Sequence, residues 1–385
     1  MKILIFNTVY LPSTIYGGPT SVAAQHAKEL VNRGHEVVIV TSNLINLKPL
    51  EYVGGKNVTS TSVIDGVKVI YFKTQMVGRK FSLLFSKELI EWAKEHVENF
   101  DVIHFHFARE LMAYSLLKIA IKKNKPVFLQ THGMLNSTTF PRNIIDKFGT
   151  IKFLNNVKGV FVLQEVEEKL IKKINPNSHT ITLPNGLNVV NNIARWNQKN
   201  LDKKVILFVA RLHPRKRVID FIEMARILNK EDNNIIFKII GPDAGDLENA
   251  VKRVKEYNLQ EKVTFEGAID RSLIYKEYAN SSIYVLPSIN EPFAMTLLEA
   301  LQVGIPTIAT EYIHNKSIFQ NSNSIIIAKS NPESLAESVL YLLKNVDTAK
   351  NLSENGKNLM LKELNINKIV DILIDSYEQN ANKTF

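Results

Sequence analysis

The sequence contains no cysteine among its 385 residues. A disulfide framework, a thiolate metal site and a cysteine nucleophile are therefore excluded, and the reducing cytoplasm is the expected location. Long apolar runs are also missing. Residues 3–6 form a run too short for a signal peptide, and no run reaches the roughly 18 residues that cross a bilayer. We therefore expect any membrane contact to be peripheral.

Several motifs of metal and dinucleotide sites are missing as well. The patterns Asp-x-Asp, His-x-x-x-His and His-Glu-x-x-His occur nowhere, and neither does Gly-x-Gly-x-x-Gly. The first three commonly hold a cation, and the last one is the fingerprint of dinucleotide binding. We therefore expect no bound metal and no nicotinamide cofactor, and a dehydrogenase is disfavoured.

The length and the pattern of apolar residues predict two α/β domains. A mass of 43.7 kDa exceeds the usual size of one core, and 45% hydrophobic with 22% charged residues is typical of globular proteins. Short apolar runs alternate with helical periodicity in both halves, which is the pattern of parallel βαβ units. We predict doubly wound domains over residues 1–185 and 204–362, a linker over 186–203, and a terminal helix within 363–385.

The positive charge is concentrated in the first half. Residues 1–190 hold 23 Lys and Arg against 14 Asp and Glu, and residues 191–385 hold 25 against 24. No basic and aromatic motif of a nucleic-acid binder accompanies this charge, so we expect no nucleic-acid partner. Residues 79–87 combine cations with large apolar side chains. They fit either peripheral contact with an anionic membrane or an amphipathic helix packed on its own sheet.

Two features of the first domain follow predicted strands at the end where ligands approach an open α/β sheet. Gly17 and Gly18 precede the first helix, where backbone N–H groups could meet an anion or a sugar, although a tight turn explains them equally well. His132 follows the strand over residues 127–130. A lone histidine is more often structural than catalytic, so its position alone leaves both interpretations open.

The second domain has a basic turn and a pair of glutamates. Arg211 to Arg217 crowd four fixed cations between a strand and a helix, which predicts a cradle for a diphosphate more readily than a solvated turn. Glu291 and Glu299 lie eight positions apart. If this segment is helical, they are about two turns apart on a related face. Such spacing suits hydrogen bonds to sugar hydroxyls better than a paired acid and base.

Taken together, these stretches resemble the retaining GT-B glycosyltransferases of family 4, also called glycosyl transferases group 1. The resemblance spans nearly the whole chain. It depends on an ordered set of motifs: Gly17-Gly18, Gly34-His35-Glu36-Val37, Thr131-His132-Gly133, Pro184-Asn185-Gly186, Arg211-Leu212 with Lys216, Ile240-Gly241, residues 263–267, Pro287-Ser288 and residues 291–299. It implies two Rossmann-like domains that face a central cleft, with the terminal helix crossing back onto the first.

The resemblance also implies roles for individual residues. Arg211 and Lys216 would bind the donor diphosphate, Glu299 the ribose of the nucleotide, and Glu291 the donor sugar. In the second domain, Gly241 and the backbone of Phe293, Ala294 and Met295 would also contact the substrate. In the first domain, His132 would contact the sugar, and Gly17 and Gly18 would lie near the diphosphate and the acceptor.

The implied reaction moves a hexose-type sugar, with retention, from a nucleotide diphosphate sugar to a glycan, a lipid-linked acceptor or a small molecule. UDP and GDP are the expected nucleotides, and no further cofactor is needed. Catalysis would come from positioning and from stabilising charge on the leaving diphosphate. The alternatives are a nucleotide-sugar epimerase on the same fold and a non-catalytic nucleotide-sugar-binding protein.

Two departures from the family pattern concern the donor site. Ala294 stands where most relatives have glycine, and an alanine would resist a positive φ angle. Glu311-Tyr312-Ile313-His314-Asn315 replaces an expected glycine pair and glutamate. We therefore expect the grip on the sugar and the loop after Ala309 to differ from those of relatives.

Overall fold

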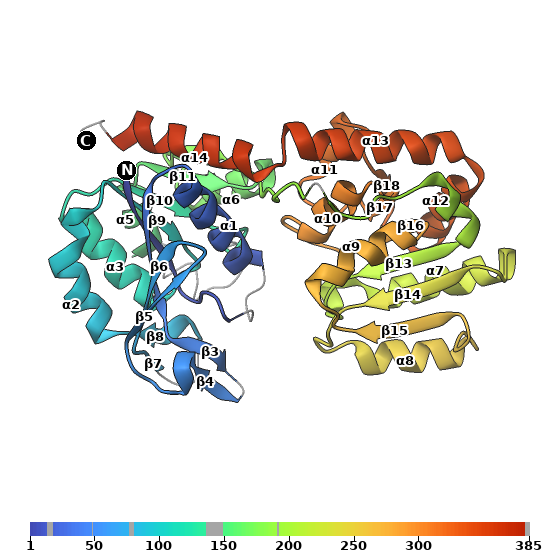
Figure 1. Cartoon of the computed structure of the whole chain (residues 1–385), viewed down its shortest axis with the longest axis horizontal. Coiled ribbons are helices and arrows are strands. Elements are labelled where there is room, and N and C mark those ends of the chain that lie inside the picture. Colours follow the sequence, from blue (N-terminus) through green and yellow to red (C-terminus); the bar gives the residue numbers. More distant parts are fainter. Residues whose placement is uncertain (14–17, 48, 77–80, 136–148, 191, 382–385) are drawn as a thin grey trace. The chain divides into compact units, whose positions relative to one another are not determined.

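The structure is a computed structural model that describes residues 1–13, 18–47, 49–76, 81–135, 149–190 and 192–381 (Figure 1). Its contacts divide the chain into two compact units. Unit 1 comprises Met1–Asn185 together with the stretch from Ile366, and unit 2 comprises Gly186–Asn365. The segment that was expected to be a linker, residues 186–203, is grouped with unit 2, where its Trp196 and Leu201 are buried.

Unit 1 is built on an eight-stranded sheet, parallel except for one edge strand. In spatial order its strands are β12 (Thr180–Thr182), β11 (Gly159–Val162), β10 (Val127–Gln130), β9 (Val102–His106), β1 (Lys2–Asn7), β2 (Glu36–Ser42), β6 (Val67–Phe72) and the antiparallel β5 (Ser60–Ile64). The α-helices among its described residues are α1 (Gly18–Asn32), α2 (Lys87–His96), α3 (Leu111–Lys122), α5 (Ile151–Leu154), α6 (Glu165–Ile174) and α14 (Ile366–Ala381). The unit also contains two short antiparallel pairs, β3 (Leu44–Leu47) with β4 (Leu50–Tyr52) and β7 (Gln75–Met76) with β8 (Leu84–Phe85).

Alternation along β1 supplies both hydrophobic cores of unit 1. Successive side chains of a strand point to opposite faces. Leu4 and Phe6 join one buried cluster with residues of α2 and α3. Ile3 and Ile5 join the other cluster, which includes residues of α1 and α14. Figure 1 shows α14 lying along unit 1 beside α1.

Unit 2 contains a six-stranded, fully parallel sheet. In spatial order its strands are β15 (Val263–Gly267), β14 (Ile236–Ile240), β13 (Val205–Val209), β16 (Ile283–Leu286), β17 (Thr307–Thr310) and β18 (Ile326–Ala328). Its helices are α7 (Val218–Glu231), α8 (Leu247–Glu256), α9 (Arg271–Asn280), α10 (Met295–Val303), α11 (Lys316–Asn321), α12 (Pro332–Lys344) and α13 (Val346–Lys362). Numbered within the unit, this order is 3-2-1-4-5-6, that of the Rossmann fold.

The predicted fold class is confirmed, because each unit is a doubly wound α/β structure on a mostly parallel sheet. Several short elements of unit 1 lie beyond the sequence prediction. The edge strand β5 was not predicted, and residues 81–85 form a 3-10 turn and a short strand where an amphipathic helix was one option. Residues 79 and 80 lie outside the described residues. In the described part of the chain, no helix has the length and apolar character needed to cross a membrane.

Candidate active site

The strand order of unit 2 creates a switch point between β13 and β16. The chain leaves β13 toward β14 and later returns to β16 on the other side. In open parallel sheets, ligands bind beyond the carboxyl ends of the strands at such a point. The basic turn at residues 211–217 follows β13, and the loop that contains Glu291 follows β16. The candidate residues of the second half therefore come from the two strands that flank the switch point.

Gly241 allows the turn after β13 to pass close to the end of β14. Its φ angle is +146°, and a Cβ at this position would overlap the carbonyl oxygen of Ala210. The Leu212 N–H donates to the Pro242 carbonyl at 2.9 Å, which holds the two loops together. Gly241 therefore has a steric role, and Arg211 lies in the turn that it supports, exposed to solvent.

A single 3-10 turn, η6 (Pro214–Lys216), positions the remaining cations of the basic turn. The ring Nδ1 of His213 accepts from the Arg215 N–H at 3.1 Å and caps this turn. The Arg215 carbonyl accepts from the Ile289 N–H at 3.0 Å, which joins the turn to the loop after β16. Lys216 thus emerges at a fixed place and is largely buried.

Lys216 and Glu291 form a largely buried ion pair. The Lys216 Nζ lies 2.5 Å from the Glu291 Oε2, and the two side chains are 13% and 6% exposed. The Arg215 Nε lies 4.0 Å from the same oxygen. One carboxylate therefore faces two cations at the switch point, and the structure brings together two of the predicted catalytic residues.

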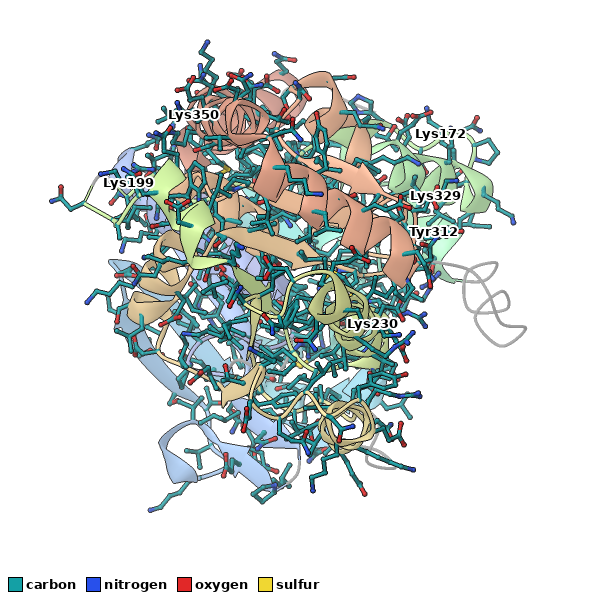
Figure 2. The ribbon with its side chains drawn as sticks, turned by 90° about the vertical axis from the view of Figure 1, so that its right-hand side faces the viewer. Lys172, Lys199, Lys230, Tyr312, Lys329 and Lys350 are labelled. Carbon is teal, nitrogen blue, oxygen red and sulfur yellow. The ribbon has the colours of Figure 1, made fainter. Side chains whose placement is uncertain are left out.

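The backbone of Glu291 connects the loop after β16 to the loop after β17. The Glu291 N–H donates to the Tyr312 carbonyl at 3.3 Å, and the Glu291 carbonyl accepts from the His314 N–H at 2.8 Å. The pKa of His314 is lowered overall, mainly by burial. The nearby Glu291 carboxylate acts in the opposite direction, and the Arg215 guanidinium adds to the lowering. The sequence that replaces the family's glycine pair thus supports Glu291 and adds an imidazole to its surroundings. Tyr312 of the same loop is exposed (Figure 2).

The helical option for the segment from Glu291 to Glu299 is not met at Glu291, whereas the expected difference in the grip on the sugar at Ala294 stays a prediction. Glu291 is not helical but lies in an isolated parallel bridge with Ile313, so the two glutamates are not two helical turns apart. The helix α10 begins only at Met295. Ala294 precedes it with φ −82° and ψ 108°, a conformation open to any L-residue. The alanine that replaces glycine therefore causes no backbone strain here.

The other predicted donor contacts lie at the start of α10. Phe293 and Ala294 are buried, and Met295 is half-buried. Glu299 lies one turn further into the helix and is half-buried. The pKa values of the buried Tyr278 and Tyr284 hydroxyls are raised, mainly by burial and in addition by the charge of Glu299. The Tyr284 hydroxyl donates to the Thr296 Oγ1 at 2.8 Å. These tyrosines support the face of α10 that carries Glu299.

In unit 1, His132 follows β10 in the left-handed region, with φ +50°. Its Nε2 lies 2.7 Å from the Nδ1 of His106, and the two rings stack at a centroid distance of 5.0 Å. Burial lowers the pKa of His132 to about 3, so this imidazole is neutral at pH 7. A neutral imidazole can donate or accept a hydrogen bond but does not act as a fixed cation.

The sequence analysis missed the two residues that hold His132. His106 was not among the predicted site residues, but it contacts His132 directly. Glu167 of α6 accepts from the Thr131 Oγ1 at 2.5 Å and from the Gly133 N–H, on both sides of His132. A glutamate on an amphipathic helix gives no sequence signal of such a role. For His106 a signal was available, because the alternation in His104-Phe105-His106 places two imidazoles on one face of β9.

Gly18 is the first residue of α1, and Gly17 lies outside the described residues. Among the described residues, none has an atom within 4 Å of a Cβ added at Gly18. The start of a helix carries N–H groups that can bind an anion. In the described part of the chain, no group of three His, Asp or Glu side chains could hold a metal ion.

Two family models match this chain. Glycosyltransferase Family 4 matches residues 16–190, and glycosyl transferases group 1 matches residues 190–359. Among curated proteins, the N-acetyl-alpha-D-glucosaminyl L-malate synthase of Bacillus anthracis is 24% identical over 393 residues, which cover 96% of this chain and 95% of the relative.

Solved structures of similar fold cover almost the whole chain. A glycosyltransferase from Rickettsia africae superimposes with a TM-score of 0.77 at 18% identity and covers 100% of both chains. Anabaena HepE, solved in complex with UDP-glucose, gives a TM-score of 0.73 at 13% identity over 98% of this chain and 100% of that one. These likenesses show the GT-B fold, with two Rossmann-like domains.

Proposed function

The chain belongs to the glycosyl transferases group 1 family of GT-B glycosyltransferases, and we propose that it transfers a hexose-type sugar from a nucleotide diphosphate sugar, with retention of configuration. UDP and GDP are the proposed nucleotides. The acceptor is a hydroxyl of a glycan, a lipid-linked molecule or a small molecule. The observation that carries this proposal is the Lys216–Glu291 pair at the switch point of unit 2.

The diphosphate would bind at the basic turn after β13. Arg211 is exposed there and can hold phosphate oxygens through its planar fork, whereas the Lys216 ammonium acts as a point charge. The negative charge that develops on the leaving diphosphate would be stabilised by these two fixed cations. We therefore propose that transfer is independent of a divalent metal, which agrees with the missing Asp-x-Asp motif.

The sugar and the nucleotide would bind on either side of this turn. The Glu291 carboxylate lies 2.5 Å from the Lys216 ammonium, so a sugar hydroxyl bound to it would lie next to the diphosphate. The backbone from Phe293 to Met295 and the carboxylate of Glu299 would contact the sugar and the ribose. His132 of unit 1 is the proposed contact from the other domain, as a neutral imidazole.

Similar proteins support the choice of donor class. Anabaena HepE was solved with UDP-glucose, and the Bacillus anthracis relative is named for transfer of N-acetylglucosamine to L-malate. The first title names a nucleotide sugar, and the second name contains a glucosaminyl group joined to malate. We propose the same donor class here; these similarities leave the base and the sugar open.

The deciding experiment is a thermal-shift screen with UDP-, GDP- and ADP-sugars, followed by a transfer assay with the donor that binds. A ligand that binds only the folded state raises its stability. We expect one nucleotide sugar to raise the melting temperature and the Arg211→Ala variant to lose that shift. The proposal fails if no nucleotide sugar binds, or if the protein binds a donor but neither transfers nor hydrolyses it.

A further inference from the structure

Unit 2 has a second concave site, at the edge of its sheet opposite to the basic turn. The Trp196 Nε1 donates to the Ser282 carbonyl at 3.2 Å, and Ser282 immediately precedes β16. The Val205 N–H at the start of β13 donates to the Ser282 Oγ at 2.9 Å. Trp196 is therefore anchored at the amino ends of the two strands whose carboxyl ends carry the proposed donor site. The strand β13 has five residues and spans roughly 16 Å, so the two sites are separate.

A cavity of about 280 Å³ lies beside Trp196, between the 3-10 helix η5 (Gln198–Lys203) and α13. Residues 196–199 form one side, and the other side consists of four residues of α13: Lys350, Ser353, Glu354 and Lys357. The last three follow Lys350 by three, four and seven positions, so the four share one face of the helix. Figure 2 shows Lys199 and Lys350 on one side of unit 2. Small-molecule pockets begin at about 300 Å³, so this cavity has room for a small molecule and not only for an ion.

The wall of this cavity is positively charged. Lys199 and Lys350 are exposed, and Lys357 is half-buried. None of these three ammonium groups forms an ion pair or a hydrogen bond with a described residue. Glu354 is the only carboxylate among the described residues that line the cavity, so positive charge is in excess by two. The cavity therefore favours an anion over a neutral or cationic molecule.

The floor of the cavity offers a hydroxyl group. Ser353 and Trp196 are 4% and 8% exposed. The Ser353 Oγ forms no hydrogen bond with a described residue, and it is not among the fully enclosed polar atoms, so it can donate to a ligand. Gly304 leaves room for this floor. A Cβ at Gly304 would lie 2.7 Å from the Ser353 Oγ and 3.1 Å from the Lys357 Cδ.

We propose that this cavity binds a soluble phosphate monoester, whose phosphate group meets the three lysines and Ser353. Such a group carries about −1.5 to −2 charges at pH 7, which matches the excess of positive charge. Its three terminal oxygens can meet three ammonium groups separately, whereas a carboxylate has two oxygens. The part of the Trp196 ring that is exposed provides an apolar contact for the carbon atoms of the ligand. Because the cavity lies apart from the switch point of unit 2, this ligand would not take part in the transfer.

A phospholipid headgroup carries the same phosphate group, but the rim of the cavity favours a soluble molecule. The exposed residues of the wall are Asn197, Gln198, Lys199, Lys350 and Glu354. None of these described residues is apolar, and a surface that rests on a membrane inserts apolar side chains into it. A headgroup held in a bilayer would also have to reach Ser353 on the floor, whereas a soluble molecule can enter the cavity.

Isothermal titration of the full chain at constant ionic strength tests this site with glycerol 3-phosphate, inorganic phosphate and succinate. We expect glycerol 3-phosphate to bind saturably, inorganic phosphate to compete with it, and succinate to bind more weakly. Lys350→Ala and Lys357→Ala should each raise the Kd of glycerol 3-phosphate about fivefold, the effect of one exposed charged contact. Glu354→Gln removes the opposing carboxylate and should lower this Kd about threefold. Lys362→Ala, an exposed lysine of α13 outside the cavity wall, is the matched control.

Two further measurements place the bound probe. The chain has two tryptophans, so the indole N–H resonances in an NMR titration are readily assigned. Glycerol 3-phosphate should shift the resonance of Trp196 and leave that of Trp92 in unit 1 unchanged, a result that requires no variant to fold. Arg211→Ala should leave the Kd of glycerol 3-phosphate within twofold, because the basic turn is not part of this cavity. No nucleotide sugar is needed, so failure here is distinct from failure of the proposed function.

Sedimentation with vesicles of phosphatidylcholine and phosphatidic acid separates the two sources of phosphate. We expect no vesicle binding that depends on Lys350. Vesicle binding that Lys350→Ala abolishes, without binding of glycerol 3-phosphate, would overturn the proposal in favour of a lipid surface. A Kd of glycerol 3-phosphate that is unchanged in both lysine variants, an equal affinity for succinate, or an unshifted Trp196 resonance would also overturn it.

Discussion

The Lys216 ammonium and the Glu291 carboxylate lie 2.5 Å apart at the switch point of unit 2, and both side chains are almost fully buried. Removing one member of a buried pair typically costs about 3 to 5 kcal/mol, and the Arg215 guanidinium, 4.0 Å from the Glu291 Oε2, reduces the cost of losing Lys216. We expect Lys216→Ala and Glu291→Gln each to lower the stability of unit 2, and the double variant to lose less than the sum of both. Denaturant unfolding of the four proteins in a double-mutant cycle measures this coupling. Strict additivity would show that the pair contributes no coupling energy.

Turnover should depend on the fixed cations and not on a metal. Wild-type activity should persist in excess EDTA, because Arg211 and Lys216 are the groups that we propose to offset the charge on the leaving diphosphate. Arg211→Ala should lower kcat by on the order of 10² to 10³, by analogy with the loss of one charge-stabilising donor. The exposed guanidinium of Arg211 makes it the cleaner variant, since its removal leaves the Lys216 pair intact. Activity that EDTA abolishes and magnesium restores would contradict this mechanism.

Glu299 should contribute to donor binding more than to folding. Its carboxylate is half-buried on α10, and the loss of a charged hydrogen-bond partner costs roughly 1 to 3 kcal/mol of binding free energy. We expect Glu299→Ala to weaken donor affinity by this amount in isothermal titration. Glu337→Ala, which removes an exposed glutamate of α12 in the same unit, is the control. Equal affinities of the two variants would remove Glu299 from the donor site.

Gly241 should be irreplaceable for a steric reason. A Cβ at this position would overlap the Ala210 carbonyl, so Gly241→Ala must displace the turn that carries Arg211. We expect a loss of at least about 2 kcal/mol of stability, together with weaker donor binding. The variant Gly245→Ala separates a steric collision from backbone strain. Gly245 also has a positive φ angle, +111°, but none of the described residues has an atom within 4 Å of its Cβ position. Similar losses in both variants would mean that the collision is relieved at little cost.

Acid should destabilise unit 1 through its buried histidines. Burial lowers the pKa of His26 and of His132 to about 3, from a usual value of 6.5 in the unfolded chain. Between these values the unfolded state binds more protons than the folded state, so stability falls as the pH drops from about 6.5 toward 3. Each histidine contributes about 1.4 kcal/mol per pH unit.

Thermal unfolding between pH 7 and pH 4 measures this slope. We expect His132→Asn to reduce the slope by the contribution of one proton, about 1.4 kcal/mol per pH unit. The variant His179→Asn, which removes an exposed imidazole, is the control. A slope that is the same in wild type and His132→Asn would show that the ring is already protonated, or accessible to protons, in the folded state.

The sequence predicted the parallel strands well, because a strand covered on both faces needs a continuous apolar run. It did not predict β5, whose Ser60–Ile64 sequence is half-exposed at the edge of the sheet and carries few apolar residues. Asp65-Gly66, both with positive φ, was the available hairpin signal.

The helical interpretation of Glu291 ignored another local signal. Pro292 follows this residue and disfavours the helical conformation before it. The contacts themselves could not be predicted. Lys216 and Glu291 are 75 positions apart, and His106 and His132 are 26 apart, so only the order of strands in each sheet brings them together.

The helix α14 also determines the order in which the chain can fold during its synthesis. Ile369, Leu373 and Tyr377 are fully buried in unit 1, and Arg33 of α1 pairs with Asp371. The Tyr377 hydroxyl bonds to the His104 Nδ1 at 2.6 Å. The part of unit 1 before Asn185 is made first but lacks this wall of its core until α14 leaves the ribosome, whereas unit 2 is one continuous stretch and is complete by Asn365. The second unit can therefore finish folding while the first still exposes an apolar face, and a nascent chain that stops before Ile366 leaves that face open to aggregation.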